Sequence, residues 1–322
     1  MQALPFWGKR DLKREAAEAE AAAAQGRASG SWTDQAARIK TTYAQYYAVT
    51  RLIELAREVL DLIGRIEGIT QARYAGGLVP QQDAIRVQVE RTAMLGELIQ
   101  METESHQARA NLNALLARPA HAPLAHPERL RPLPSPARLD HEALEMRARE
   151  KNPQIFAADA RMRAAEKNRD LAYRNRYPDF TVGVSPIQTR NRVNEWELML
   201  ELNIPLQQGS RRSQEREADK MIDVARARKD ATANQLLAEL SSQLAAIDAS
   251  RRMETLAQGS LLPQAELTFK AALAGYESGK VDFATLLDAQ RQIRIARQDI
   301  IKARSEQQVR LAEVERLIGE DL

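Results

Sequence analysis

The chain has 322 residues, of which 47 are Lys or Arg and 44 are Asp or Glu, so its formal net charge is only +3. Charges of both signs are mixed along it, which argues against nucleic acid as its main partner. Cysteine is absent, which excludes disulfides, thiolate metal sites and cysteine nucleophiles. The 14 Gly, 13 Pro and 5% aromatic residues are few for a compact α/β enzyme, and the composition is typical of long helices.

The first ten residues, MQALPFWGKR, lack the basic segment followed by an apolar segment that marks a secretory signal peptide. Taken alone, this predicts a cytoplasmic protein, but the body of the chain indicates a different location. No apolar run approaches the ~18 residues that predict a transmembrane helix.

Two halves of the chain resemble each other. Tyr74–Val79 (YAGGLV) is similar to Tyr276–Val281 (YESGKV), and three further short matches keep the same order at nearly the same offset. Each repeat reads as a strand end, a long helix, a Tyr-x-x-Gly break and a second long helix. We therefore expect three regions: an incomplete first repeat over 1–118, a Pro-rich linker over 119–140, and a helix–strand–strand–helix–helix repeat over 141–322.

The second repeat predicts unusually long helices. Residues 207–258 contain no Pro and a single Gly, and residues 282–318 contain neither. A helix of about 50 residues extends roughly 75 Å. The last segment also carries a heptad seam with small residues at one of its two positions, which predicts a closely packed coiled coil. The seam consists of Leu286, Ala289, Ile293, Ala296, Ile300, Ala303, Val314 and Leu317, and its equivalents in the first repeat are Met94, Leu98, Met101, Ala108, Leu112 and Leu115.

Between the repeats, six prolines from Pro119 to Pro136 exclude helix and predict an irregular linker. This region also holds His121 and His126, with His141 just beyond it. Because these histidines have no fixed ligand spacing, we expect loop residues rather than a metal site.

Residues 196–204 (WELMLELNI) alternate strictly between apolar and polar side chains, close to the 9–11 residues of a tilted membrane strand. Residues 180–185 alternate similarly, and the polar stretch 186–194 predicts a loop that joins the two into a β-hairpin. A soluble sheet has the same pattern, but an isolated hairpin is barely stable in water. We therefore expect hairpins of several copies to close a barrel in a membrane. The residues expected to face lipid are Trp196, Leu198, Leu200, Leu202 and Ile204, and those expected to face the lumen are Glu197 and Glu201.

Three segments in order, LLPQAE at 261–266, YESGKVDF at 276–283 and LLDAQ at 286–290, resemble the C-terminal helical repeat of the TolC family of outer-membrane efflux proteins. Tyr177–Phe180 (YPDF) before a strand, and Pro205 after one, also fit. The resemblance covers nearly the whole chain and is more specific in the second repeat. It implies a mainly α-helical fold of long antiparallel coiled-coil helices in an α-barrel, with a small transmembrane β-barrel built from β-hairpins.

The resemblance further implies a homotrimeric exit duct in the outer membrane with a periplasmic extension. In this family, each protomer gives four strands to the barrel, and a periplasmic adaptor protein links the helix tips to an inner-membrane pump of the resistance-nodulation-division type. The exported cargo would be small molecules or heavy-metal ions. The tip residues that close the channel and contact the adaptor would be Tyr74, Gly77, Val79, Tyr276, Gly279 and Asp282.

Several of these roles have simpler alternatives. The glycines suit a tight turn between helices. The tyrosines either contact a partner or only pack the turn, and Asp282 is favoured as the N-cap of the next helix over a gate carboxylate. Glu197 and Glu201 are favoured as ordinary lumen polarity over a bias toward cations.

The chain departs from the family at its start. The family has a signal peptide, a long helix and a strand before the first return strand, whereas Gln2–Pro5 already fits that return strand. A barrel that lacks one strand per protomer leaves backbone groups unpaired in lipid, at a cost of several kcal/mol each. We therefore predict an N-terminal truncation, a mis-called start or a fragment, with the signal and a lipid-anchor cysteine in the missing part.

No phosphate-loop, dinucleotide-binding, nucleophile-elbow or zinc-protease motif is present. Carboxylates alternate with Arg along the helices, as on a solvated face. We expect neither an enzyme nor a cofactor, but a passive conduit gated at its periplasmic helix tips. The alternatives are a soluble coiled-coil scaffold or periplasmic adaptor, which should also carry a lipoyl-like β-domain, and a non-functional truncated remnant.

Overall fold

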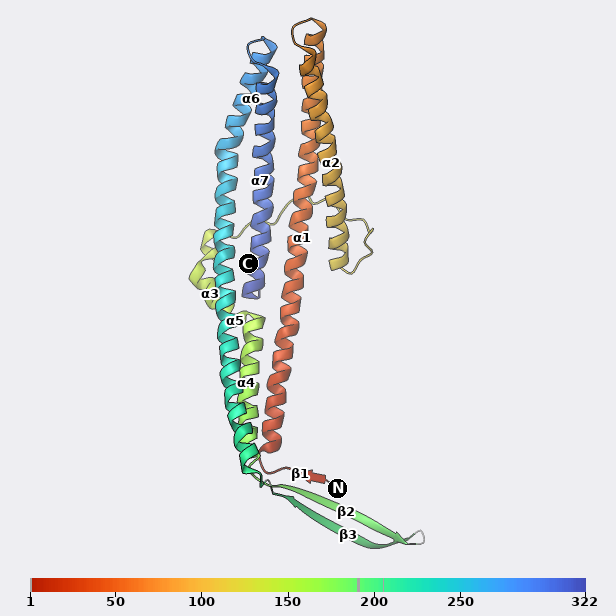
Figure 1. Ribbon diagram of the computed structural model, residues 1–322, viewed down its shortest axis with the longest axis vertical. Coiled ribbons are helices and arrows are strands. Elements are labelled where there is room, and N and C mark those ends of the chain that lie inside the picture. Colours follow the sequence, from red (N-terminus) through yellow and green to blue (C-terminus); the bar gives the residue numbers. More distant parts are fainter. Residues whose placement is uncertain (1, 190–191, 205) are drawn as a thin grey trace. The chain divides into compact units, whose positions relative to one another are not determined.

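The computed structural model describes residues 2–189, 192–204 and 206–322, and confirms a mainly helical fold with a small antiparallel sheet (Figure 1). Pro205, which the sequence places after a strand, lies outside the described residues. The elements in chain order are β1 (Gln2–Leu4), α1 (Lys9–Ala75), α2 (Gln81–Leu115), a 3₁₀ turn (Pro136–Leu139), α3 (His141–Lys151), α4 (Pro153–Arg174), β2 (Asp179–Thr189), β3 (Arg192–Asn203), α5 (Gln208–Leu256), a π-helical segment (Ala257–Leu261), α6 (Leu262–Glu277) and α7 (Phe283–Ile318).

The helices follow the two sequence repeats. Positions equivalent to α2 in the second repeat are 283–317, and α7 spans Phe283–Ile318. The predicted long helices are present, since α1 has 67 residues and α5 has 49. The π-helical segment comes just before Pro263, which lacks a backbone donor, and a wider turn accommodates that loss. In the part of the chain that the structure describes, no helix is both long enough and apolar enough to cross a membrane.

The chain forms two compact units, to which both α1 and α5 contribute. Unit 1 comprises the residues up to Trp32 together with Leu144–Ala238, and unit 2 comprises Thr33–Ala143 together with Glu239–Leu322. Each unit combines parts of both repeats, because the long helices run from one unit into the other. These two units do not correspond to the predicted regions 1–118, 119–140 and 141–322, because those regions were defined by sequence repeats and not by compactness. The predicted division therefore stays a prediction.

In unit 1, α1 and α4 approach closely through small residues. Ala23 and Ala160 are completely buried. At Gly26, an added Cβ would lie 2.9 Å from Cδ1 of Phe156 and 3.0 Å from the carbonyl oxygen of Pro153. A side chain at Gly26 would therefore push the helices apart.

The sheet of unit 1 has the order β1-β2-β3 and is antiparallel throughout. The predicted loop over 186–194 is wrong in extent, because β2 continues to Thr189 and β3 begins at Arg192. Pro186 is tolerated within β2 because β1 pairs only with Phe180–Val182, so β2 has no β1 partner at the level of Pro186. Polar composition had suggested a loop, but polar residues also extend a strand when a partner strand is in register.

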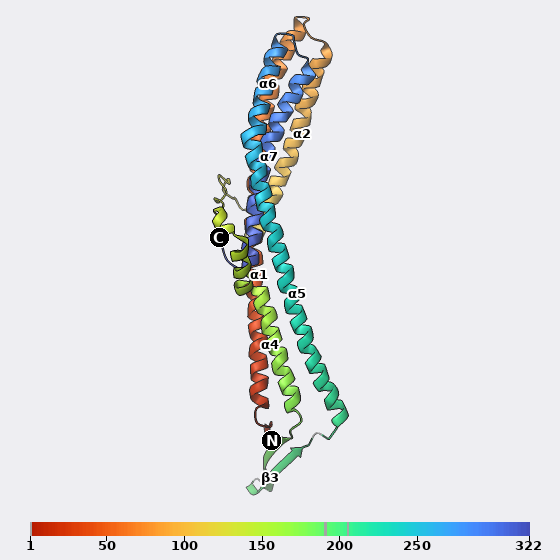
Figure 2. The same cartoon turned by 90° about the vertical axis from the view of Figure 1, so that its left-hand side faces the viewer.

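The helices α1, α2, α6 and α7 of unit 2 lie side by side (Figure 2) and share a large apolar core, and a second apolar cluster lies between α1 and α2. The heptad seam of α7 is confirmed, because Leu286, Ala289, Val314 and Leu317 are at most 2% exposed. Met94 and Leu112, their counterparts on α2, are also buried. The seam therefore predicted the buried face of α7 correctly, and on α2 it found two buried residues and four partly buried ones, Leu98, Met101, Ala108 and Leu115.

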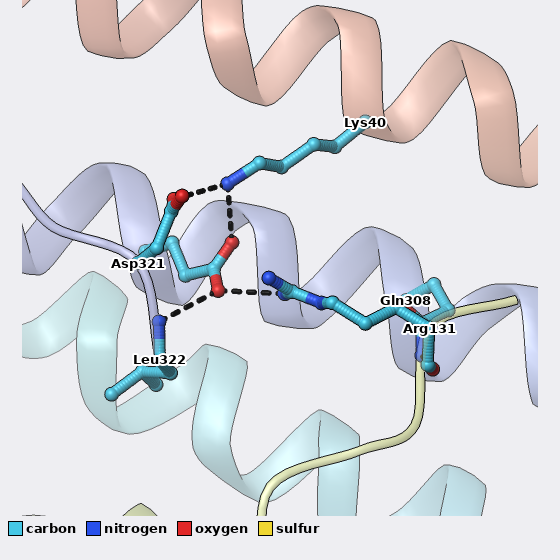
Figure 3. Close-up of polar contacts among 6 residues, drawn as sticks. Lys40, Arg131, Gln308, Asp321 and Leu322 are labelled. Atoms are coloured by element: carbon cyan, nitrogen blue, oxygen red, sulfur yellow. Dashed lines mark hydrogen bonds and ion pairs between the residues drawn. The ribbon is translucent and has the colours of Figure 1, made fainter.

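The Pro-rich linker is irregular, as predicted, and a buried carboxylate holds it in unit 2 (Figure 3). Glu315 on α7 has a side chain only 3% exposed. It accepts hydrogen bonds from Lys40 Nζ at 2.7 Å, from Arg131 Nη2 at 2.6 Å and from the backbone N–H of Leu322 at 2.9 Å. Lys40 also pairs with Asp321, and this hydrogen bond lowers the pKa of Asp321 despite partial burial.

Replacing Glu315 with Gln should destabilise unit 2 by about 2 kcal/mol, because Lys40 and Arg131 lose their shared carboxylate. Urea unfolding followed by helical circular dichroism measures this. Glu306→Gln on the same helix is the matched control, because Glu306 forms an exposed pair with Arg310 and should cost less than ~0.5 kcal/mol. Equal losses in the two variants would contradict the assigned role of Glu315.

Candidate functional site

Two helix turns of unit 2, α1–α2 and α6–α7, lie at the same end of that unit (Figure 1). Gly77 and Gly279 have φ values of 69° and 74°, which residues with a Cβ rarely adopt. Their N–H groups donate to the carbonyls of Tyr74 and Tyr276 at 2.9 and 3.0 Å. The prediction that both glycines form tight turns is confirmed, and the two turns share one backbone geometry.

The tyrosines of the two turns have different environments. Tyr276 is 2% exposed, contacts Phe283 edge-on with ring centroids 5.8 Å apart, and donates its hydroxyl to Oγ1 of Thr70 at 3.3 Å. Tyr74 is 45% exposed. Val79 packs partly buried against the core of unit 2. Packing alone therefore explains Tyr276, whereas Tyr74 is accessible to a partner.

Sequence reasoning missed Arg73, which joins the two turns. Its guanidinium lies over the ring of Tyr276, 5.1 Å from the centroid, and Nη1 donates to the carbonyl oxygen of Glu277 at 2.5 Å. The equivalent position in the second repeat is Gly275, where an added Cβ would lie 2.5 Å from Cγ2 of Val281. The sequence did offer a signal for this contact: at equivalent positions of the two repeats, one has a large cation, Arg73, and the other has a glycine, Gly275, that leaves no room for a side chain.

Asp282 is the N-cap of α7, as the sequence favoured. Its carboxylate accepts hydrogen bonds from the backbone N–H of Thr285 at 3.0 Å and from the Thr285 hydroxyl at 2.5 Å. The hydroxyl contact, together with the N–H contact, lowers the pKa of Asp282. The carboxylate therefore has a structural role at the turn whatever else it contacts.

A second candidate site is the apolar face of the sheet in unit 1. Directly paired residues share a face, so Leu198 and Leu200 lie beside Val184 and Val182. Ile204 directly follows β3 instead of belonging to it. The large apolar side chains of this face are exposed in the described chain: Trp196 by 70%, Leu198 by 74%, Leu200 by 72%, Leu202 by 47% and Ile204 by 54%.

The opposite face of the sheet is polar. Glu201 pairs with Thr181, and Glu197 pairs with Ser185. Both glutamates are exposed. An apolar face of this size without a cover is uncommon in a soluble monomer and indicates an interaction surface.

Within the described residues, no three His, Asp or Glu side chains gather in a way that could hold a metal ion. The two candidate sites are therefore the pair of helix turns and the amphipathic sheet.

Residues 144–320, more than half of the chain, match the family described as outer membrane efflux protein. The chain therefore belongs to this family of outer-membrane transport channels, which confirms the predicted resemblance and the predicted outer-membrane location.

Individual relatives agree with this assignment. The cobalt-zinc-cadmium resistance protein CzcC of Cupriavidus metallidurans is 29% identical over 303 residues, which are 91% of this chain and 70% of that protein. The solved structure of CusC has a TM-score of 0.89 at 17% identity, covering 99% of this chain and 76% of that one. The outer membrane protein VceC of Vibrio cholerae has a TM-score of 0.86 at 18% identity, covering 99% and 78%. These structures show the same fold.

The different tyrosine environments lead to a prediction. Tyr276→Ala should destabilise unit 2 by about 3–4 kcal/mol, because it removes a buried ring from the core. Tyr74→Ala, the equivalent change in the other repeat, should cost less than ~0.5 kcal/mol because that ring is half exposed. Hydrogen exchange of the α6 and α7 amides measures both losses. Similar losses at the two positions would contradict the asymmetry between the turns.

Proposed function

We propose that this chain is the protomer of a homotrimeric exit duct in the outer membrane. In this proposal, the face with Trp196, Leu198, Leu200, Leu202 and Ile204 contacts lipid. The face with Glu197 and Glu201 lines a water-filled barrel shared between protomers. The observation that carries the proposal is the uncovered apolar face of the sheet, which is the pattern of a membrane barrel strand.

The turns of unit 2 are proposed to close the duct and to contact a periplasmic adaptor protein, which links it to an inner-membrane pump. Tyr74 and Leu78, which are 45% and 68% exposed, supply accessible side chains for this contact. The remaining predicted tip residues, Gly77, Val79, Tyr276, Gly279 and Asp282, would act by fixing the shape of the turns. The open gate would then require the contacts of Arg73 across the turns to separate.

The proposed cargo is divalent transition-metal ions. The relative CzcC is named for resistance to cobalt, zinc and cadmium. Two carboxylates on the proposed wet face, Glu197 and Glu201, are compatible with the passage of cations, although ordinary lumen polarity alone explains them. A pump elsewhere would supply the energy, so the duct itself needs no catalytic group.

The membrane assignment is tested by placing a charge on each face of β3. Leu200→Arg should reduce the amount of trimer in the outer membrane strongly, because an arginine facing lipid near the midplane costs about 2–4 kcal/mol. Met199→Arg, one residue earlier on the wet face, is the matched control and should be tolerated. Quantitative immunoblots of outer-membrane fractions measure both. Equal tolerance of the two variants would mean that this face does not contact lipid.

The cargo is tested in a strain that lacks the gene. Such a strain should lose tolerance to cobalt, zinc and cadmium by severalfold in minimal inhibitory concentration, and the restored gene should return it. Hydrophobic drugs serve as the comparison cargo. Sensitivity to drugs without sensitivity to metals would reject the proposed metal cargo but would not contradict the proposal that the chain forms an exit duct.

A further inference from the structure

Positive charge is concentrated where the helices of unit 1 meet the sheet. We define the basic collar as Trp7–Arg14, Arg174–Asp179 and Leu206–Arg216, which adjoin the ends of α1, α4 and α5 next to the strands (Figure 2). These segments hold nine Lys or Arg and three Asp or Glu, a net charge of +6. Since the whole chain carries +3, the remaining residues carry −3.

Some of these charges pair with each other and fix the collar. Lys9 is buried and contacts Asp179 at 2.8 Å, which ties the start of α1 to the start of β2. Arg176 holds Glu215 through two hydrogen bonds of 2.6 Å, which ties the end of α4 to α5. The collar is therefore a built surface rather than a set of independent side chains.

Five exposed cations form no direct ion pair in the part of the chain that the structure describes: Arg10, Lys13, Arg174, Arg212 and Arg216. Lys13 and Arg212 interact only at longer range with Asp179 and Glu215. Arg216 donates hydrogen bonds to the carbonyl of Arg212 and the hydroxyl of Ser213, so the other four carry the argument.

Two large apolar side chains lie in the same segments. Trp7 is 88% exposed and Leu206 is 80% exposed. Arg174 lies next to the backbone beside Trp7, because a Cβ added at Gly8 would be 3.7 Å from the guanidinium carbon of Arg174. Apolar strand, tryptophan and basic side chains thus follow one another in the order found at a membrane–water interface.

We propose that the basic collar binds anionic phospholipids, with Arg10, Lys13, Arg174 and Arg212 contacting phosphate groups and Trp7 inserted at the headgroup level. The leaflet is the one that meets the helices. Guanidinium groups match phosphate oxygens through paired hydrogen bonds, and a positive surface beside an apolar one selects a negatively charged bilayer. The inference rests on the proposed insertion of the sheet into the membrane.

The test measures which lipids surround Trp7. The other two tryptophans are replaced (Trp32→Phe, Trp196→Phe), and the full chain is reconstituted into phosphatidylcholine vesicles. A small fraction of either phosphatidylglycerol or phosphatidylcholine, brominated near the headgroup, is added as the quencher. Brominated phosphatidylglycerol should associate about tenfold more strongly with the surroundings of Trp7, and high salt should remove most of that preference.

The variant Arg10→Gln/Lys13→Gln/Arg174→Gln/Arg212→Gln should lower the preference to about one. The matched control replaces three exposed arginines farther along α4 and α5, Arg161→Gln/Arg226→Gln/Arg228→Gln, and should keep it. The single change Lys13→Gln should lower the preference for phosphatidylglycerol partially. Because this variant removes only one charge, it still tests the proposal if the fourfold variant misfolds.

Flotation of the same vesicles separates this inference from the proposed function. If the chain is integrated and both lipids quench Trp7 equally, the collar proposal is overturned and the duct stands. If the chain does not integrate, both are overturned. If the fourfold variant instead loses trimers in lipid-free detergent, the cations serve subunit contacts, and the lipid proposal is rejected.

Discussion

The structure depends on one constraint: a three-stranded sheet presents an apolar face that nothing in the described chain covers. The edges of the sheet add a second demand, since β1 pairs only with β2 and β3 pairs only with β2. In a bilayer, lipid can cover the apolar face, but unpaired edge groups require further strands. The same sheet therefore supports the proposal of a membrane environment and of several associated copies, in which the polar face with Glu197 and Glu201 would be the wet side.

Away from the sheet, the two helix turns of unit 2 repeat one backbone geometry but differ in their side-chain contacts. The two turns have the same glycine geometry, yet Tyr276 is buried and Tyr74 is half exposed. The difference follows from neighbours: Phe283 and Arg73 contact the ring of Tyr276. One turn thus forms a packed support, and the other keeps accessible side chains. A duplicated backbone with unequal side chains gives one turn with a buried ring and one turn with an exposed ring.

The sequence predicts those parts of the structure that depend on local patterns. The absence of Pro and Gly predicted the long helices, the seam of Leu286 and Ala289 predicted the buried face of α7, and the alternation over 196–204 predicted β3. Contacts between distant residues were missed, because no local pattern encodes them. Arg73 and Glu277 are 204 positions apart, and Arg131 and Glu315 are 184 apart. The extent of the hairpin was missed for the same reason, because strand length depends on the partner strand.

Net charge says little about the basic collar. A total of +3 averages over segments of opposite sign, so the expectation of no nucleic-acid partner does not bear on a local positive surface. Electrostatic attraction to a surface acts over about 8 Å in physiological salt, so the local density of charge decides it. Lys9 and Arg176 form direct ion pairs within the fold, whereas Arg10, Lys13, Arg174 and Arg212 form none in the described residues. Exposed cations are well hydrated and need no partner in water, so their presence alone indicates no ligand; these cations lie beside an exposed tryptophan, and that combination suits a phosphate-rich interface.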